Sequence, residues 1–277
     1  MNFVNVIFEN TTCYDDYMER LQKLLFEKGY IVDNSIKDAK KLIIKEQNYN
    51  PLIWDIALEP VQKPYILRLF YLDKDIDKTY IEDCYFKKTP FGFDIFTENS
   101  YVFELLKEKY KDYIYADDYQ SLEEVLIKTL KEKSKTVVCA ESCTGGMISA
   151  SLVNVAGSSS VFLGGFVVYS NDFKTKFLNV DKTLIEKHGA VSEEVVRAMA
   201  LGALEYTDAD ISIAVSGIAG PGGSEYKPQG FTYMAIGTDE GTLTYNYTFK
   251  SDRNTNRRQA TAFVLFKLLK DVLKFTL

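Results

Sequence analysis

The segment VVCAESCTGG, residues 137–146, contains residue types that could perform nucleophilic chemistry. Ser142 is a candidate nucleophile, and the glycines at its end let the chain turn tightly and leave backbone N–H groups accessible. Amides near Thr144, Gly145 and Gly146 could therefore hold an oxyanion. The alternative is structural, because a Ser or Thr before two glycines is also typical of a helix N-cap.

A serine nucleophile needs a base within hydrogen-bond distance. The only histidine, His188, precedes Gly189, which predicts an ordinary position at a helix end. Lys174 follows an uncharged stretch, residues 142–171. If the preceding strands end at one edge of a parallel sheet, Lys174 approaches Ser142, and burial would lower its pKa toward that of a useful base. Considered alone, a lysine is more often a solvated surface residue.

Three of the six arginines, Arg253, Arg257 and Arg258, lie within SDRNTNRRQAT. Arg253 and Arg257 are four residues apart and share a face of the helix expected there. Planar guanidinium groups suit recognition of phosphate or carboxylate, although surface salt bridges are the alternative. The sequence leaves open which of the three contacts a phosphate. The glycine-rich loop SGIAGPGG, residues 216–223, could line a nucleotide or serve as a structural turn.

Around these motifs the second half of the chain alternates between strand and helix patterns. The expected strands are 136–140, 161–170 and 211–217, followed by a hairpin of 231–237 and 242–250. The expected helices are 144–155, 172–178, 182–188, 192–207 and about 254–273. This order predicts a layered α/β/α domain with a mixed sheet, in which ligands bind at the carboxyl ends of strands.

The first half has a different composition. All but two of the 16 glycines lie at or after Gly145, whereas 13 of the 19 tyrosines lie before residue 120. A strand over 3–8, a helix over 17–29 and apolar runs at 51–58 and 65–72 predict a smaller α+β domain. We expect domains of residues 1–115 and 116–277, with a helix from Ser121 to about Glu132 opening the second.

Composition excludes several function classes. A net charge of −6, with 46% hydrophobic and 26% charged residues, is typical of a soluble globular protein without general affinity for nucleic acid or anionic membrane. The four cysteines, Cys13, Cys84, Cys139 and Cys143, form no CxxC pair, which argues against a zinc site or a disulfide framework. The N-terminus lacks the pattern of a signal peptide, so we expect a cytoplasmic protein with reduced thiols and no metal.

Five motifs resemble the C-terminal domain of the CinA family of competence/damage-inducible proteins. They are AESCTGG, VFLGGFVVYSNDFK, KHGAVSEEV, SGIAGPGG with the following KPQG, and SDRNTNRRQA, in order across about residues 110–277. This family includes the nicotinamide-nucleotide amidohydrolases called PncC, which hydrolyse the carboxamide of nicotinamide mononucleotide with a serine and a lysine and without metal. The resemblance implies Ser142 and Lys174 as that pair, no cofactor, a small nucleotide substrate and a homodimer or higher homo-oligomer.

The motifs also imply substrate-binding positions. They are Thr144, Gly145 and Gly146 at the reacting group, Tyr169, Asn171 and Gly220 along the ring and ribose, and Arg253 or Arg257 at the phosphate. Residues 1–115 lack the GGLGPT-like signature of the larger N-terminal domain in long CinA proteins, and only the stretch 85–118 is weakly similar to them. We therefore expect a reduced remnant without pyrophosphatase activity. The alternative function is a non-enzymatic nucleotide- or partner-binding protein of the competence or DNA-damage response.

Overall fold

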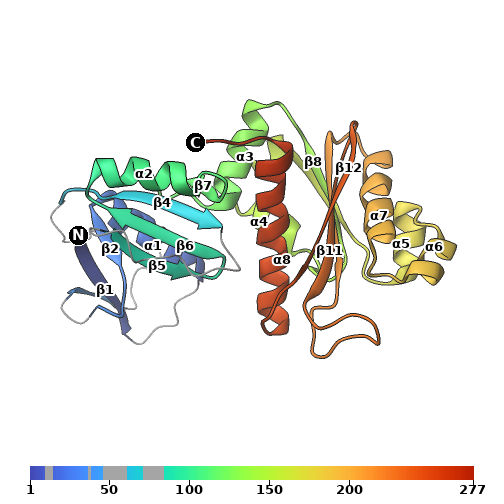
Figure 1. Ribbon diagram of the computed structural model, residues 1–277, viewed down its shortest axis with the longest axis horizontal. Helices are drawn as coiled ribbons and strands as arrows, with labels where there is room; N and C mark the ends of the chain where they lie inside the picture. Colours follow the sequence, from blue (N-terminus) through green and yellow to red (C-terminus); the bar gives the residue numbers. More distant parts are fainter. Residues whose placement is uncertain (10–14, 37–38, 46–60, 71–83) are drawn as a thin grey trace. The chain divides into compact units, whose positions relative to one another are not determined.

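The structure is a computed structural model that describes residues 1–9, 15–36, 39–45, 61–70 and 84–277. The chain divides into two compact units, Met1–Tyr119 and Gln120–Leu277. Figure 1 shows the elements of each unit.

The second unit is built on a five-stranded mixed sheet with the strand order β12-β11-β10-β8-β9. Its three parallel strands are β8 (Val137–Glu141), β9 (Phe162–Val167) and β10 (Ile211–Gly217). The antiparallel hairpin of β11 (Phe231–Thr238) and β12 (Gly241–Thr248) extends the sheet beyond β10. The carboxyl ends of β8, β9 and β10 therefore share one edge.

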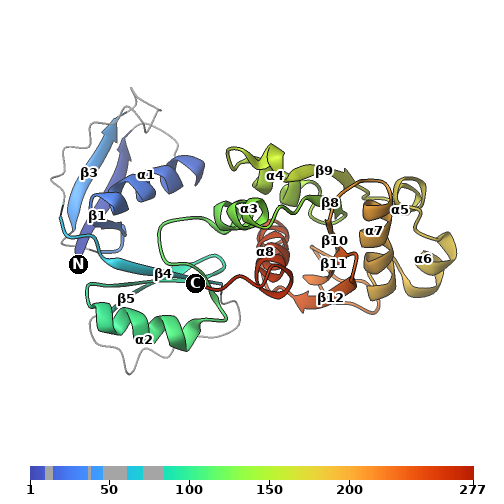
Figure 2. The same ribbon diagram turned by 90° about the horizontal axis from the view of Figure 1, so that it is seen from above.

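Helices cover both faces of this sheet, as Figures 1 and 2 show. One face carries α3 (Leu122–Glu132), α4 (Met147–Val153) and α8 (Arg253–Lys267), which continues as a π-helical turn, Leu268–Val272. The other carries α5 (Asn171–Leu178), α6 (Lys182–His188) and α7 (Glu193–Glu205). The expected layered α/β/α architecture is confirmed.

Local sequence signals set where these helices begin and end. Ser121 and Glu124 form a reciprocal capping box at α3, and the Ser192 hydroxyl accepts from the Val195 amide at α7. His188 ends α6 as expected, and its Nδ1 lies 3.1 Å from a Glu194 carboxylate oxygen. Helix α4 begins later than expected, at Met147, because Gly145 and Gly146 adopt φ values of +59° and +92° that interrupt a right-handed helix.

The first unit contains two sheets. A parallel sheet in the order β2-β1-β3 comprises β1 (Asn2–Glu9), β2 (Tyr30–Val32) and β3 (Lys40–Lys45). Helix α1 (Asp15–Glu27) connects β1 to β2 as a βαβ unit. The antiparallel sheet has the order β5-β6-β4-β7, with β4 (Tyr65–Phe70), β5 (Cys84–Thr89), β6 (Gly92–Thr97) and β7 (Ile114–Ala116). Helix α2 (Ser100–Tyr110) packs on this second sheet.

This α+β organisation agrees with the expected fold class, but several of its elements were not foreseen. Strand β3 and the β5–β6 hairpin carry no strong alternating pattern, and the apolar run 51–58 and Cys13 lie outside the described residues. Strand β7 pairs with β4, so residues up to Ala116 belong to the first unit. The Tyr119 hydroxyl also donates to Gln22 of α1, at 2.8 Å.

Candidate functional site

Ser142 lies immediately after β8, at the edge where the parallel strands end. Its backbone amide donates to the Val215 carbonyl of β10 at 3.0 Å, which fixes the chain as it leaves the sheet. Strand β9 ends beside it, and α5 then begins with Ser170 as its N-cap. This parallel arrangement places Lys174, one turn into α5, at the same edge.

The structure brings the two predicted catalytic side chains together. The Nζ of Lys174 lies 3.2 Å from the Oγ of Ser142. It also donates to the carbonyl oxygens of Val168 and Tyr169, at 3.0 and 3.1 Å. Lys174 is 1% exposed and Ser142 is 7% exposed, so this contact lies almost entirely away from solvent.

Burial lowers the pKa of Lys174 below its ordinary value, because desolvation disfavours the ammonium form. The ion pairs among the described residues include none with Lys174. A neutral amine has one lone pair. With two N–H groups directed at carbonyls, that lone pair can accept the proton of the Ser142 hydroxyl.

The neighbouring thiol of Cys143 is a competing nucleophile by residue type. Burial raises its pKa to about 12, so it remains a neutral thiol at physiological pH. Thiols react as thiolates, and a buried neutral thiol is inert. Of the two adjacent side chains, Ser142 is therefore the one equipped with a base.

Glu141 is a structural residue of the site to which sequence reasoning assigned no role. Its fully buried carboxylate accepts hydrogen bonds from the amides of Gly146, Ile148 and Ser149, at 2.9, 3.1 and 2.8 Å, and from the Ser149 hydroxyl at 2.7 Å. These amides form the N-terminus of α4, where negative charge is favourable. An acidic residue at the junction of a strand and a glycine turn is the signal that could have indicated this anchor.

The backbone amides after Ser142 differ in availability. The Gly145 amide donates to the Ser142 carbonyl at 3.1 Å, and the Gly146 amide is bound to Glu141. Neither amide is free in this structure to donate a hydrogen bond to an oxyanion, although the sequence had suggested both as donors. The Thr144 amide has no acceptor in the part of the chain that the structure describes. The Thr144 hydroxyl is also buried without a hydrogen-bond partner there.

Arg257, which is half-buried, donates two hydrogen bonds to the turn after Ser142. Its Nε donates to the Cys143 carbonyl at 2.9 Å and its Nη2 to the Thr144 carbonyl at 2.7 Å. Because a peptide is planar and trans, fixing the Cys143 carbonyl also fixes the opposite direction of the Thr144 N–H. These bonds direct Arg257 at the turn after Ser142, whereas the sequence had left Arg253 and Arg257 open as phosphate ligands.

The glycine-rich loop after β10 is held by α8. Arg253 donates through Nη1 to the Gly220 carbonyl, and the buried Asn256 amide donates to the carbonyls of Ala219 and Ser251 at 3.0 and 2.9 Å. Arg253 is exposed, and its bond to Gly220 uses one of the five N–H groups of a guanidinium. Asn256 is a further positioning residue that sequence reasoning missed.

The remaining expected residues are exposed at the same sheet edge. Tyr169 is 64% exposed, and Asn171, the first residue of α5, is exposed as well. The Tyr169 carbonyl itself accepts a hydrogen bond from Lys174, and Asn171 lies two residues further along the chain. Arg258 is exposed on α8.

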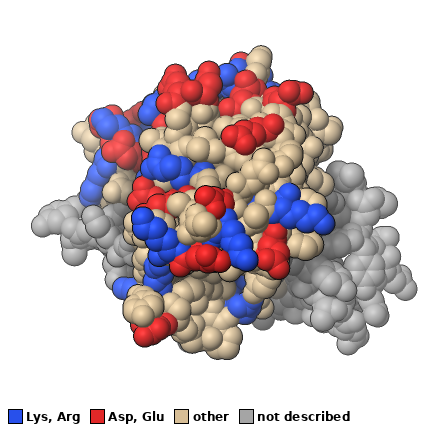
Figure 3. All heavy atoms as spheres, turned by 90° about the vertical axis from the view of Figure 1, so that its right-hand side faces the viewer, with Lys and Arg blue, Asp and Glu red and all other residues tan. Residues whose placement is uncertain are grey.

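The described residues form neither a metal site nor a membrane-spanning helix. No group of His, Cys, Asp and Glu side chains within the described ranges could hold a metal ion. None of the helices built from those residues has the length and apolarity needed to span a bilayer. On the α5–α6 side of the molecule, Figure 3 shows lysine and arginine side chains interspersed with aspartate and glutamate. That face carries no extended basic area among its described atoms.

Comparisons with known proteins agree with the fold of the second unit. The family model of the CinA C-terminal domain matches residues 119–272. A CinA-like protein of Thermotoga neapolitana is 44% identical over 168 residues, which cover 60% of this chain and 41% of that protein. A CinA-like protein of Prochlorococcus marinus is 45% identical over 153 residues, which cover 54% of this chain and 36% of that protein. The chain thus spans about two fifths of the length of these curated relatives.

Solved structures show the same relationship. A competence-damaged protein (CinA) superfamily protein from Escherichia coli has a TM-score of 0.53 and 34% identity, covering 55% of this chain and 88% of that chain. The competence/damage inducible protein CihA from Agrobacterium tumefaciens has a TM-score of 0.53 and 36% identity, covering 56% of this chain and 94% of that chain. Through the domain that carries Ser142 and Lys174, this chain belongs to the CinA family.

Proposed function

We propose that this protein hydrolyses the carboxamide of nicotinamide mononucleotide to nicotinate mononucleotide and ammonia. The observation that carries the proposal is the 3.2 Å contact between the buried Lys174 amine and the Ser142 hydroxyl. A serine beside a lysine of lowered pKa is a nucleophile with its base, and it needs neither histidine nor metal. The substrate comes from the resemblance of the motifs to the amidohydrolases of the CinA family.

In the first half of the proposed reaction, Ser142 Oγ bonds to the carboxamide carbon as its proton passes to Lys174 Nζ. Negative charge then develops on the carboxamide oxygen. The Thr144 amide, which has no acceptor among the described residues, is the proposed donor to that oxygen. Arg257 keeps this amide oriented by binding the carbonyl of the same peptide.

In the second half, the C–N bond breaks and the Lys174 ammonium gives its proton to the departing nitrogen, which leaves as ammonia. An ester of Ser142 remains. Water attacks this ester with Lys174 again acting as the base, and the proton returns to Ser142 Oγ as the carboxylic acid product forms. Each proton that Lys174 accepts is donated again within one turnover.

Substrate recognition follows from the groups around the pair. Arg253 is proposed to bind the 5′-phosphate, because it is exposed beside the glycine-rich loop, whereas Arg257 is bonded to two carbonyls of the turn after Ser142. Tyr169 and Asn171 are proposed to contact the ring and the ribose. Gly220 is proposed to let the glycine-rich loop approach the nucleotide closely. Nicotinamide riboside lacks the phosphate and should be a poor substrate.

The experiment measures ammonia release from nicotinamide mononucleotide by the purified full chain. Ser142→Ala and Lys174→Met should each retain below about 1% of the wild-type kcat, because loss of a nucleophile or its base typically costs orders of magnitude. Lys176→Met, an exposed lysine on the same helix, is the matched control and should leave kcat unchanged. A wild-type chain that binds the nucleotide for hours without releasing ammonia would instead support the non-enzymatic alternative.

A further inference from the structure

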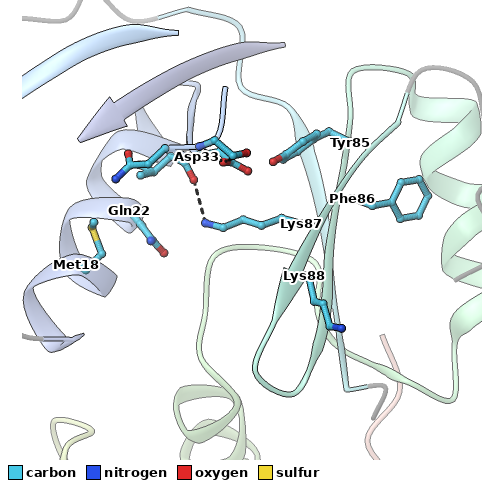
Figure 4. Close-up of a pocket in the computed structure, with 10 residues that line it drawn as sticks. Met18, Gln22, Asp33, Tyr85, Phe86, Lys87 and Lys88 are labelled. Atoms are coloured by element: carbon cyan, nitrogen blue, oxygen red, sulfur yellow. Dashed lines mark hydrogen bonds between the residues drawn. The ribbon is translucent and has the colours of Figure 1, made fainter. Parts of the chain in front are cut away.

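We propose that the first unit contains a second ligand site, a cavity that binds the phosphate or carboxylate group of a small molecule. The cavity has a volume of about 460 Å³ and lies within Met1–Tyr119, apart from the residues of the Ser142 site. Figure 4 shows its lining. The wall is formed by Met18, Gln22, Val32, Asp33, Asn34, Ser35, Tyr85, Phe86, Lys87 and Lys88.

The cavity occupies a position where α/β proteins commonly bind ligands. Its lining includes the turn that follows β2, at the carboxyl end of a strand in a βαβ unit. Helix α1 supplies one wall and β5 of the antiparallel sheet supplies another. The Asn34 side chain binds both the amide and the carbonyl of Val6, at 2.7 and 3.0 Å, so this turn is held in place without a ligand.

Lys87 is the main evidence for an anionic ligand. Its side chain extends from β5 toward α1 and the turn after β2 (Figure 4). The Nζ donates to the Val32 carbonyl at 2.9 Å, its one hydrogen bond among the described residues. An ammonium group has three N–H donors, so two remain for a ligand. Burial lowers the pKa of Lys87 even though the negative charges of Asp94 and Asp33 oppose the shift, and an anion bound beside Lys87 would offset more of the lost solvation.

The neighbouring groups add donors and restrict the shape of the ligand. Gln22 accepts the Tyr119 hydroxyl through Oε1, which leaves its NH₂ group to donate. The Oδ1 of Asp33 already accepts from the Ser35 amide and hydroxyl, at 2.8 and 2.6 Å. Tyr85 extends from the same face of β5 as Lys87, whereas Phe86 points to the opposite face (Figure 4). The cavity thus combines cationic and amide donors and an aromatic wall with one carboxylate, Asp33, whose Oδ1 is engaged by Ser35.

Residue-resolved acetylation of the full chain tests this proposal. Trace acetic anhydride is added with chloride, inorganic phosphate or succinate at equal ionic strength, and the modification of each lysine is measured by mass spectrometry. A bound anion that raises the pKa of Lys87 by half a unit lowers its neutral fraction roughly threefold. We expect phosphate or succinate to slow acetylation of Lys87 by about that factor or more, with no change at the exposed Lys111. The two arms show whether phosphate or carboxylate is preferred.

Variants separate the cavity from the catalytic site. Gln22→Met keeps the side-chain length and removes the amide donors, so it should weaken the protection of Lys87, while Lys111→Met should preserve it. Circular dichroism checks that both variants fold. Because Lys174 is quantified separately, anion binding at the Ser142 site cannot imitate the effect. Equal acetylation of Lys87 in chloride, phosphate and succinate would overturn the proposal and leave the proposed amidohydrolase activity untouched.

Discussion

Lys174 acts in the proposed reaction as a neutral amine, and this form determines the pH dependence. Burial lowers its pKa, so the active form exists at lower pH than for an exposed lysine. Below that lowered pKa, log kcat/KM should rise with a slope of about one per pH unit, and above it the profile should level off. Initial rates of ammonia release from about pH 5 to 10 provide the measurement, because this range lies below the ordinary pKa of a lysine. A profile without an ascending limb would contradict the role of Lys174.

The two arginines near the start of α8 should affect different kinetic constants. Arg257→Ala releases the carbonyls of Cys143 and Thr144, so the Thr144 amide loses its orientation and kcat should fall at least about tenfold. Arg253→Ala removes charge-assisted bonds of about 1.5–3 kcal/mol to the phosphate and should raise KM roughly 10- to 150-fold. Steady-state kinetics on nicotinamide mononucleotide distinguishes the two effects.

Nicotinamide riboside provides the control for that pair of variants. Arg253→Ala should not change kcat/KM for the riboside, because the group that Arg253 binds is absent. Arg257→Ala should lower kcat for both substrates. If Arg257→Ala raised KM for the nucleotide alone, Arg257 would be a phosphate ligand, and its contacts with the turn would be secondary.

At the scale of elements, the buried Glu141 carboxylate joins the end of β8 to the start of α4. Helix α4 has Gly146 as its N-cap and no side-chain cap, and Glu141 supplies the acceptors for the Ile148 and Ser149 amides of its first turn. In Glu141→Gln, one oxygen becomes an NH₂ group that cannot accept from the amides. We expect a loss of about 1.5–3 kcal/mol in the free energy of unfolding, measured by urea denaturation.

The matched control for this variant is Glu186→Gln, an exposed residue of α6. It should shift the unfolding midpoint far less, since exposed ion pairs contribute little. Glu141→Gln should also lower kcat, because Ser142 is the next residue. An unfolding midpoint for Glu141→Gln that matches the control would show that α4 does not depend on this anchor.

At the scale of the whole molecule, the second unit should fold and react without the first. The Escherichia coli and Agrobacterium tumefaciens structures match only about half of this chain while covering 88% and 94% of their own, so similar domains exist alone. A chain of residues 118–277 retains the capping box at Ser121 and omits β7, which belongs to the first unit. We expect its kcat to lie within about tenfold of the full chain, a difference of ~1.4 kcal/mol in barrier.

Circular dichroism and ammonia release measure the two parts of this prediction. A shortened chain that folds but lacks activity would show that the first unit contributes to the reaction. A chain that aggregates while the full-length protein stays soluble would show that the first unit stabilises the second. In the expected case, the first unit is left for a separate role, consistent with a ligand cavity of its own.

The sequence by itself singled out Ser142 and Lys174 as the candidate pair and predicted the layered domain that brings them together. Both depend on short-range patterns: strand and helix periodicity, capping residues such as Ser121 and Ser192, and an uncharged stretch that ends before Lys174. Two parallel strands that are neighbours in a sheet must end at the same edge, so residues just after them meet. The approach of Lys174 to Ser142 follows from that rule.

The tertiary structure alone decided how the turn after Ser142 is used. Gly145 and Gly146 have equally permissive backbones, yet their amides donate to nearby acceptors, whereas the Thr144 amide has no acceptor among the residues that the structure describes. Arg257 reaches the Cys143 carbonyl across 114 residues of sequence. Every buried donor competes for the acceptors that the fold brings near it, and no local pattern records that competition. The cavity around Lys87 is likewise a product of the tertiary structure. Its wall combines α1 and the turn after β2 with β5, and no sequence motif links these segments.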